Sequence, residues 1–163
     1  MTGKQQEITE LLQRTIDRFN RKEQYLIEND LCERCICARF AMYLERTVSR
    51  SIFRSYTTDV EYDRGMGGNG YGKKRVFGHD VYLDIIVHKR GYDDLIGYDN
   101  LFALELKWQG EDFDQDKKRL RALVDNENGF NYRAGFAIRI IRNAPNDIPG
   151  LKIEDAFYNA SDF

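Results

Sequence analysis

The sequence predicts one α/β domain in which helices flank a central mixed β-sheet. The chain has 163 residues, enough to enclose one hydrophobic core but too few for two full domains. Hydrophobic residues make up 42% and charged residues 32%, a balance typical of soluble globular proteins. Segments with helical spacing of apolar residues alternate along the chain with strand-like segments, as in α/β folds.

Two helices are expected before the first strand. Apolar side chains recur at helical spacing between residues 5 and 25, which indicates an amphipathic helix. A second helix is predicted to begin with Asn29 or Asp30 as its N-cap and to end near Ser51. Its apolar surface is wide, so we expect it to be largely buried against a sheet.

Four strands and a third helix are expected after these two helices. Two strands in succession with a short connection favour an antiparallel meander, while a helix before the last strand allows a parallel crossover. The expected elements are strands at 54–62, 81–88, 101–108 and 132–141 and a helix at 113–125.

The domain is expected to have three parts. Residues 1–28 form an N-terminal helical extension, residues 29–141 the core, and residues 142–163 a C-terminal tail of ambiguous structure. Within the core, the glycine-rich stretch 65–72 is predicted to be a hairpin loop within reach of a substrate. It lacks the Gly-Lys-Ser/Thr ending of a phosphate-binding P-loop.

Nothing in the sequence predicts a membrane or secretory protein. The strongly apolar runs are strand-sized, far short of the roughly 20 residues of a membrane helix. The first residues contain no apolar signal-peptide core, so a cytoplasmic location is expected. The net charge of −2 gives no overall attraction for nucleic acid, and such binding would depend on local basic clusters at 73–75 and 117–121.

Three cysteines, Cys32, Cys35 and Cys37, lie close together in a predicted helix. An odd number in so short a span argues against a disulfide framework, and reduced thiols are expected. A zinc site is the alternative, but no second Cys or His pair with zinc-like spacing follows. The simpler interpretation is that Cys35 is a small buried apolar residue and that Cys32 and Cys37 fill gaps in helix packing.

Charged residues interrupt two otherwise apolar strands. Asp84 lies in the second strand, and the third carries Glu105 and Lys107. Because side chains alternate along a strand, Glu105 and Lys107 project from one face, and pairing of the strands brings Asp84 to that face. Two carboxylates beside an ammonium suit phosphodiester hydrolysis with magnesium or manganese, in which the lysine orients the attacking water.

Two other interpretations of these residues stay open. The first is an interstrand salt bridge of Lys107 with Asp84 or Glu105 on a solvated sheet face, without a metal. The second is that Asp80, in the turn before the strand, takes the metal position instead of Asp84.

Between residues 29 and 141 the chain resembles the PD-(D/E)XK nuclease superfamily, which has the restriction-endonuclease-like fold. Asp84 falls at the aspartate of the family motif, and Glu105-Leu106-Lys107 falls at its (D/E)-x-K part. The expected core order of helix, three strands, helix and strand (αβββαβ) is also that of the superfamily. Glu33 resembles the helix glutamate that many members carry, and residues 59–64 resemble the strand ending of some small members.

The resemblance implies catalytic residues and a cofactor. One departure is Leu83, which precedes Asp84 where the motif has proline. The implied catalytic residues are Asp84, Glu105, Lys107 and Glu33, and the implied ligands of Mg²⁺ or Mn²⁺ are Asp84, Glu105 and Glu33. The expected substrate-binding residues, from basic clusters and polar family positions, are Arg64, Lys73, Lys74, Arg75, Gln109 and Lys117.

The expected activity is that of a divalent-metal-dependent, endonuclease-like phosphodiesterase acting on nucleic acid, with DNA favoured over RNA. A homodimer is compatible with cutting both strands, although no sequence feature demonstrates one. The alternative from another class is a catalytically silent nuclease-fold binding or scaffold subunit of a larger complex. A metal-dependent hydrolase of nucleotides or other phosphate esters is a third interpretation.

Overall fold

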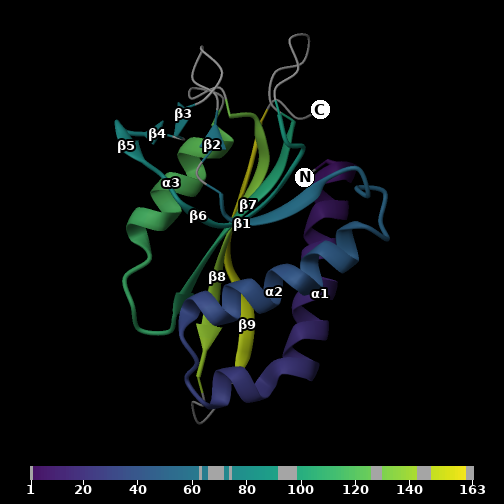
Figure 1. The fold of residues 1–163 in the computed structure, drawn as a ribbon, viewed down its shortest axis with the longest axis vertical. Helices are drawn as coiled ribbons and strands as arrows, with labels where there is room; N and C mark the ends of the chain where they lie inside the picture. The colour runs from purple at the N-terminus through teal and green to yellow at the C-terminus, as the bar shows by residue number, and fades with distance from the viewer. Residues whose placement is uncertain are drawn as a thin grey trace.

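A five-stranded mixed β-sheet forms the centre of the protein (Figure 1). β1, β6 and β7 form an antiparallel meander, β8 is parallel to β7, and β9 is antiparallel to β8. This arrangement confirms the predicted α/β class with its meander and parallel crossover. In spatial order the strands are β1 (Thr57–Tyr62), β6 (Leu83–His88), β7 (Asn100–Trp108), β8 (Tyr132–Ile141) and β9 (Gly150–Tyr158).

The structure is a computed structural model that describes most of the chain. Six residues are described by their backbone alone, namely residues 62, 64, 65, 72, 73 and 75. The described residues are 2–62, 64, 65, 72, 73, 75–91, 99–125, 130–142 and 148–160.

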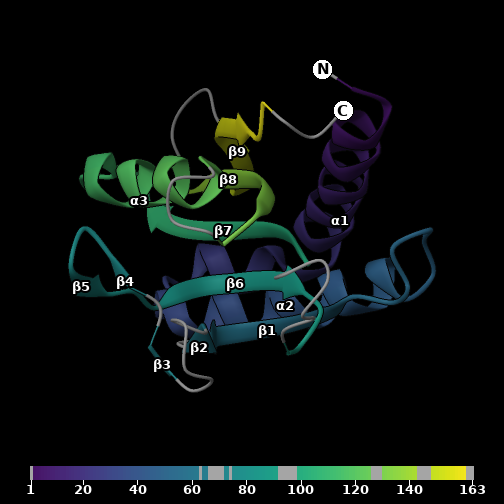
Figure 2. The ribbon, with the colours of Figure 1, turned by 90° about the horizontal axis from the view of Figure 1, so that it is seen from above.

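Three helices cover the two faces of the sheet (Figures 1 and 2). α1 (Gly3–Glu28) and α2 (Glu33–Val48) share a hydrophobic core with residues of one sheet face, such as Phe136. α3 (Asp114–Val124) packs on the opposite face, against residues such as Ala103, and connects β7 to β8. Among the described residues, no helix combines the length and the apolar surface that crossing a membrane requires.

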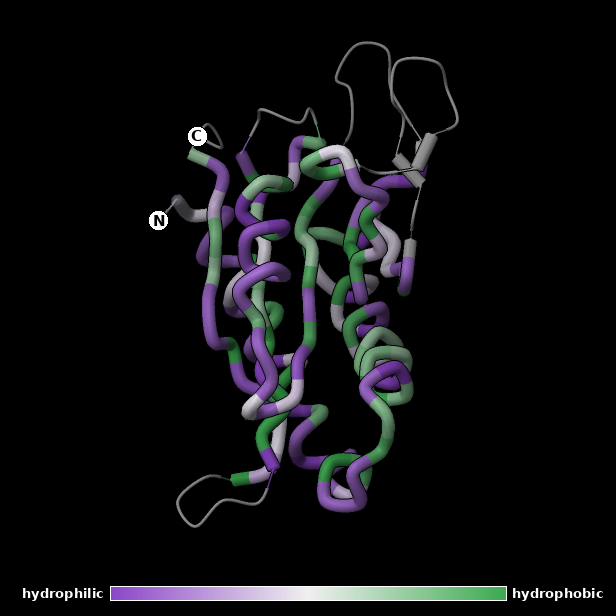
Figure 3. The backbone as a smooth tube through the Cα atoms, turned by 90° about the vertical axis from the view of Figure 1, so that its left-hand side faces the viewer, coloured by the Kyte–Doolittle hydropathy of each residue, from purple (hydrophilic) through white to green (hydrophobic). Residues whose placement is uncertain are grey.

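Each helix has one buried and one exposed side, which is why the apolar spacing predicted them. Green and purple alternate around the helices in Figure 3, as expected for amphipathic helices. In α3, for example, Leu120 and Leu123 are buried while Lys118 and Arg121 are not. The helical spacing of apolar residues in the sequence therefore indicates which side of each helix faces the sheet.

The boundary between α1 and α2 differs from the prediction. α1 extends to Glu28 with Asn29 as its C-cap, and α2 begins at Glu33 with Cys32 as its N-cap. Asp30, between them, has a φ of 51°, a left-handed conformation that aspartate tolerates and that helps to turn the chain. The prediction that Asn29 or Asp30 caps the second helix is wrong, because the buried stripe of α1 continues past residue 25.

The segment whose structure was ambiguous from sequence belongs to β9, the outermost strand beside β8. α1 is joined to the start of this strand through Asn20. Its Nδ2 donates to the carbonyl oxygen of Leu151 at 3.0 Å, and the N–H of Leu151 donates to Asn20 Oδ1 at 2.8 Å. Residues near the two ends of the chain therefore pack together.

Two short hairpins lie between β1 and β6. β2 (Arg64–Gly65) pairs with β3 (Gly72–Lys73), and β4 (Arg75–Val76) pairs with β5 (His79–Asp80). The middle of the glycine-rich stretch, residues 66–71, lies outside the described residues. The interpretation of that stretch as a substrate loop stays a prediction.

Phe136 tests the core beneath α1 and α2. Its fully buried ring meets those of Phe102 and Tyr158 edge to face, with centroid distances of 5.8 and 6.0 Å. We expect Phe136→Ala to lower the free energy of unfolding by about 3–5 kcal/mol, because it leaves a cavity. Ile148→Ala, which shortens a side chain that is 84% exposed, should change that free energy by less than about 0.5 kcal/mol. Urea unfolding measures both, and equal effects would contradict this description of the core.

Candidate active site

The register of β6 and β7 brings Asp84 and Glu105 together. Ile85 pairs with Leu104 on the antiparallel neighbour, so Asp84 lies opposite Glu105. Leu104 belongs to the core beneath α1 and α2, and by alternation Glu105 points to the face that carries α3. The two carboxyl groups therefore meet on one face of the sheet.

Glu105 is an ionisable side chain in the interior of the protein, where the residue is only 3% exposed. Burial raises the pKa of Glu105 well above its usual range, and the negative charge of Asp84 raises it further. The positive charge of Arg119 acts in the opposite direction. Side-chain hydrogen bonding with Asp84 also raises the pKa of Glu105, so the environment of Glu105 favours its protonated form.

Asp84 is fixed to the strand that carries Glu105. The backbone N–H of Leu106 donates to Asp84 Oδ2 at 2.7 Å. Burial raises the pKa of Asp84, although the hydrogen bonds from Leu106 and Glu105 counteract part of this effect. The bond to the backbone restricts the position of the Asp84 carboxylate relative to Glu105.

Lys107 is half-buried two residues beyond Glu105 on the same face of β7. Its Nζ lies 3.6 Å from Oδ2 of Asp116 on α3. Burial lowers the pKa of Lys107, but the surrounding carboxylates, Asp116 first, outweigh burial and raise it. Lys107 is therefore a cation that lies among carboxylates, and it is not poised as a neutral base.

Glu33 approaches this group from the first turn of α2, where it is half-buried. Burial raises its pKa, the charge of Lys107 lowers it, and the charge of Asp84 raises it. These mutual effects put Glu33 within electrostatic reach of the residues on β6 and β7. Glu33 also lies at the positive end of the α2 dipole, which favours its negative charge.

α3 adds a basic residue that the sequence analysis did not assign to the site. Arg119 Nη2 lies 3.3 Å from Glu105 Oε1 and also donates to Oδ1 of Asp116, one helical turn earlier. Arg119 Nε is buried and has no hydrogen-bond partner among the described residues. The sequence pattern that could have pointed to Arg119 is the helical spacing of Asp116, Leu120 and Leu123, which identifies the buried side of α3.

The expected substrate-binding residues near the hairpins are only partly described. The backbones of Arg64 and Lys73 pair with each other, and Arg75 pairs with Asp80. Lys74 lies outside the described residues. Asp80, the rival of Asp84 for the metal position, is exposed on β5.

The other two expected substrate-binding residues are Gln109, which directly follows β7, and Lys117, which lies in α3. Gln109 is exposed, and its backbone N–H donates to the carbonyl oxygen of Ile140 at 2.9 Å. Lys117 Nζ lies 2.6 Å from a carboxylate oxygen of Glu154 and 2.6 Å from one of Asp155. A phosphate at Lys117 would compete with both carboxylates, and its role in substrate binding stays a prediction.

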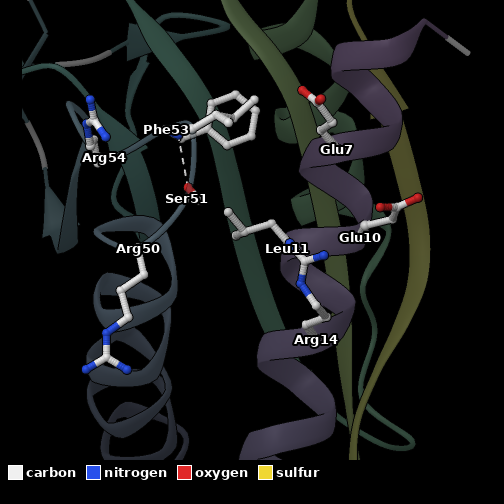
Figure 4. A pocket seen from close by; sticks show the side chains of 9 residues that line it. Glu7, Glu10, Leu11, Arg14, Arg50, Ser51, Phe53 and Arg54 are labelled. Atoms are coloured by element: carbon white, nitrogen blue, oxygen red, sulfur yellow. Dashed lines mark hydrogen bonds between the residues drawn. The ribbon is translucent and has the colours of Figure 1, made fainter.

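A surface groove of about 480 Å³ lies between α1 and the turn after α2 (Figure 4). Glu7 and Glu10 line it from α1, while Arg50 and Arg54 line it from the turn. None of the predicted site residues lines this groove. It is therefore separate from the group formed by Asp84, Glu105 and Lys107.

The chemistry of the site fits a hard divalent cation. Mg²⁺ and Mn²⁺ prefer carboxylate oxygens, which Asp84, Glu105 and Glu33 supply. Burial raises the pKa of each of these three groups, and the negative charge of Asp84 raises the pKa of Glu33 and Glu105 further. A bound cation would offset that negative charge. In the part of the chain that is described, no three His, Cys, Asp or Glu side chains form a ready-made metal-ligand cluster.

Comparisons with known proteins identify no relative. No family model, no curated protein and no solved structure matches the chain. A functional assignment therefore depends on the geometry and chemistry of the residues themselves.

Glu105→Gln tests the burial of the carboxyl group through the pH dependence of stability. Because the pKa of Glu105 is raised in the folded protein, the unfolded chain loses its proton first as the pH rises above about 4.5. Wild-type stability then falls until the pH exceeds the folded-state pKa. We expect the variant, in EDTA, to be more stable than wild type at pH 7 and to lose this advantage near pH 4.

Urea unfolding between pH 4 and pH 8 measures the difference. Glu10→Gln, on the exposed surface of α1, is the matched control and should follow the wild type at each pH. A Glu105→Gln difference that grows toward acidic pH would contradict the raised pKa.

Proposed function

We propose that the protein is a divalent-metal-dependent nuclease of the PD-(D/E)XK type. The observation that carries the proposal is the meeting of Asp84 and Glu105 on one sheet face, with Lys107 beside them. The order α2, β1, β6, β7, α3, β8 supports it, because it follows the αβββαβ core order of that superfamily. Strongly perturbed ionisable groups that cluster in this way are typical of catalytic sites.

In this proposal Asp84 and Glu105 hold Mg²⁺ or Mn²⁺, with Glu33 as a third ligand, direct or through water. A bound divalent ion polarises a phosphate and lowers the pKa of a coordinated water. Lys107 supplies a fixed positive charge that orients the attacking water and stabilises the developing negative charge. The hydrogen bond from the Leu106 N–H restrains the Asp84 carboxylate and so would hold it in position relative to Glu105.

Arg119 has a second role in this proposal. Without a divalent ion, its guanidinium partly neutralises Glu105. A divalent ion held by Glu105 would supply that compensation instead, and the partly exposed guanidinium of Arg119 would then be available to a phosphate. Arg119 would thus help to position the substrate.

The proposed substrate is DNA, bound by local positive charge. The net charge of −2 gives no general attraction, so the basic residues of the hairpins and of α3 would make the phosphate contacts. A homodimer in the cytoplasm is the form that would cut both strands with two identical sites.

A second candidate is a catalytically silent nuclease-fold subunit that binds or organises a larger complex. The observation that favours it is the set of internal ion pairs, in which Arg119 contacts Glu105 and Lys107 contacts Asp116. These pairs compensate part of the acidic charge without any metal. The two candidates differ in whether a divalent ion binds and whether phosphodiester bonds break.

Cleavage assays test the proposed activity. Purified protein with Mg²⁺ or Mn²⁺ is incubated with supercoiled plasmid, linear duplex, single-stranded DNA and RNA. We expect cleavage of DNA that EDTA abolishes and that Glu105→Gln and Lys107→Met each slow by about 100-fold or more, because each removes charge that stabilises the transition state. Glu10→Gln and Lys152→Met change exposed residues outside the site and should cleave like the wild type. Cleavage that survives EDTA and both site variants would sink the proposal.

Metal binding provides a readout that does not depend on turnover. Because burial raises the pKa of Glu105 well above its usual range, a divalent ion that binds this carboxylate competes with a proton. We expect Mn²⁺ affinity to rise with pH and calorimetry in two buffers of different ionisation enthalpy to show proton release. Asp84→Asn should weaken binding, while Asp17→Asn, on the surface of α1, should leave it unchanged. Absence of both Mn²⁺ binding and cleavage would favour the silent subunit.

A further inference from the structure

Cys32 and Cys35 form a close pair of thiols at the start of α2. Cys32 is the N-cap residue and Cys35 lies in the first turn, and their Sγ atoms are 3.0 Å apart. Both residues are exposed, whereas Cys37 on the same helix is buried. The prediction that Cys35 is buried is wrong, because Cys35 is exposed in contact with Cys32 and the buried cysteine is Cys37.

We propose that Cys32 and Cys35 form a dithiol that exchanges with external disulfides and closes reversibly to an intramolecular disulfide. A disulfide has an S–S length of about 2.05 Å, so closure requires the two sulfurs to approach by only about 1 Å. The N–H of Cys35 donates to the carbonyl oxygen of Cys32 at 2.9 Å, which already holds the two residues in one turn. This inference does not depend on the proposed nuclease function.

The exchange needs an external oxidant, for which a small-molecule disulfide suffices. One sulfur of the pair attacks the S–S bond of the oxidant, forming a mixed disulfide and releasing one small thiol. The second sulfur attacks the first, which closes the bond between Cys32 and Cys35 and releases the second small thiol. The protein loses two electrons and two protons, and the two released thiols carry both.

Exposure decides which cysteines take part. The first attack requires the oxidant to reach a sulfur, which both members of the pair allow. Cys37 is 5% exposed and belongs to the hydrophobic core beneath α1 and α2, so an external disulfide cannot reach it while the protein is folded. The folded protein should therefore lose two of its three thiols together and keep the third.

Thiol counting across a series of oxidised-to-reduced glutathione ratios tests the proposal. Samples of the full chain are quenched with acid, unfolded and alkylated with a maleimide reagent that shifts gel mobility. We expect alkylated thiols to fall from three to one per chain, with a mass loss of two hydrogen atoms and recovery after dithiothreitol. Peptide mapping should identify the link between Cys32 and Cys35. Three alkylated thiols at every ratio would overturn the proposal.

Two variants and an unfolded sample sharpen the test. Cys37→Ser should close its disulfide at the same ratio as the wild type. Cys35→Ser should stop at a glutathione adduct on Cys32 with no internal disulfide. The urea-unfolded chain should need a more oxidising ratio, because the fold holds the sulfurs together. Equal closure in the folded and unfolded chains would show that the fold does not create the pair and would refute the inference.

Discussion

The burial of one carboxyl group, that of Glu105, is the constraint on which the arrangement of the site depends. β7 is the middle strand of the sheet and has helices on both faces, so its inward side chains are removed from water. An isolated charge there would be strongly unfavourable. An ion pair with Arg119 on α3 reduces this penalty, whereas Asp84 on β6 favours the protonated form of Glu105.

The position of α3 follows from the parallel crossover and determines which charges surround Glu105. The same helix buries apolar residues against the sheet and presents Asp116 and Arg119 to the carboxyl pair. Lys117 on this helix forms an ion pair with Glu154 on β9, and Arg139 on β8 contacts the same carboxylate. Hydrogen bonding to Arg139, with a second contribution from Lys117, holds the pKa of Glu154 at about 2. The strand that was ambiguous from sequence thus helps to fix the helix that completes the site.

The sequence predicted a helix or strand well where one face of that element is buried, because burial of one face imposes a regular spacing of apolar residues. Residues 132–141 were predicted as a strand and form β8 with those bounds, and the isolated charges on β6 and β7 predicted which residues meet. Arg119 was not assigned, because the rotation of α3 decides which member of a basic cluster turns inward. The start of α2 was misplaced because Asn29 suits either end of a helix. β9 was ambiguous because several polar residues lie on its exposed side.

Selection for stability alone does not account for the buried acidic group. An apolar side chain of similar size in place of Glu105 would avoid the cost of burying a charge, and such replacements are often neutral or stabilising. A purely structural ion pair would lower the pKa of its carboxylates, as Glu154 shows, whereas the pKa values of Asp84, Glu105 and Glu33 are all raised. Arg119 and Lys107 therefore compensate the acidic charge only in part. The remaining deficit of positive charge, next to a fixed ammonium, is the physical basis of the proposal that a divalent ion binds at this point.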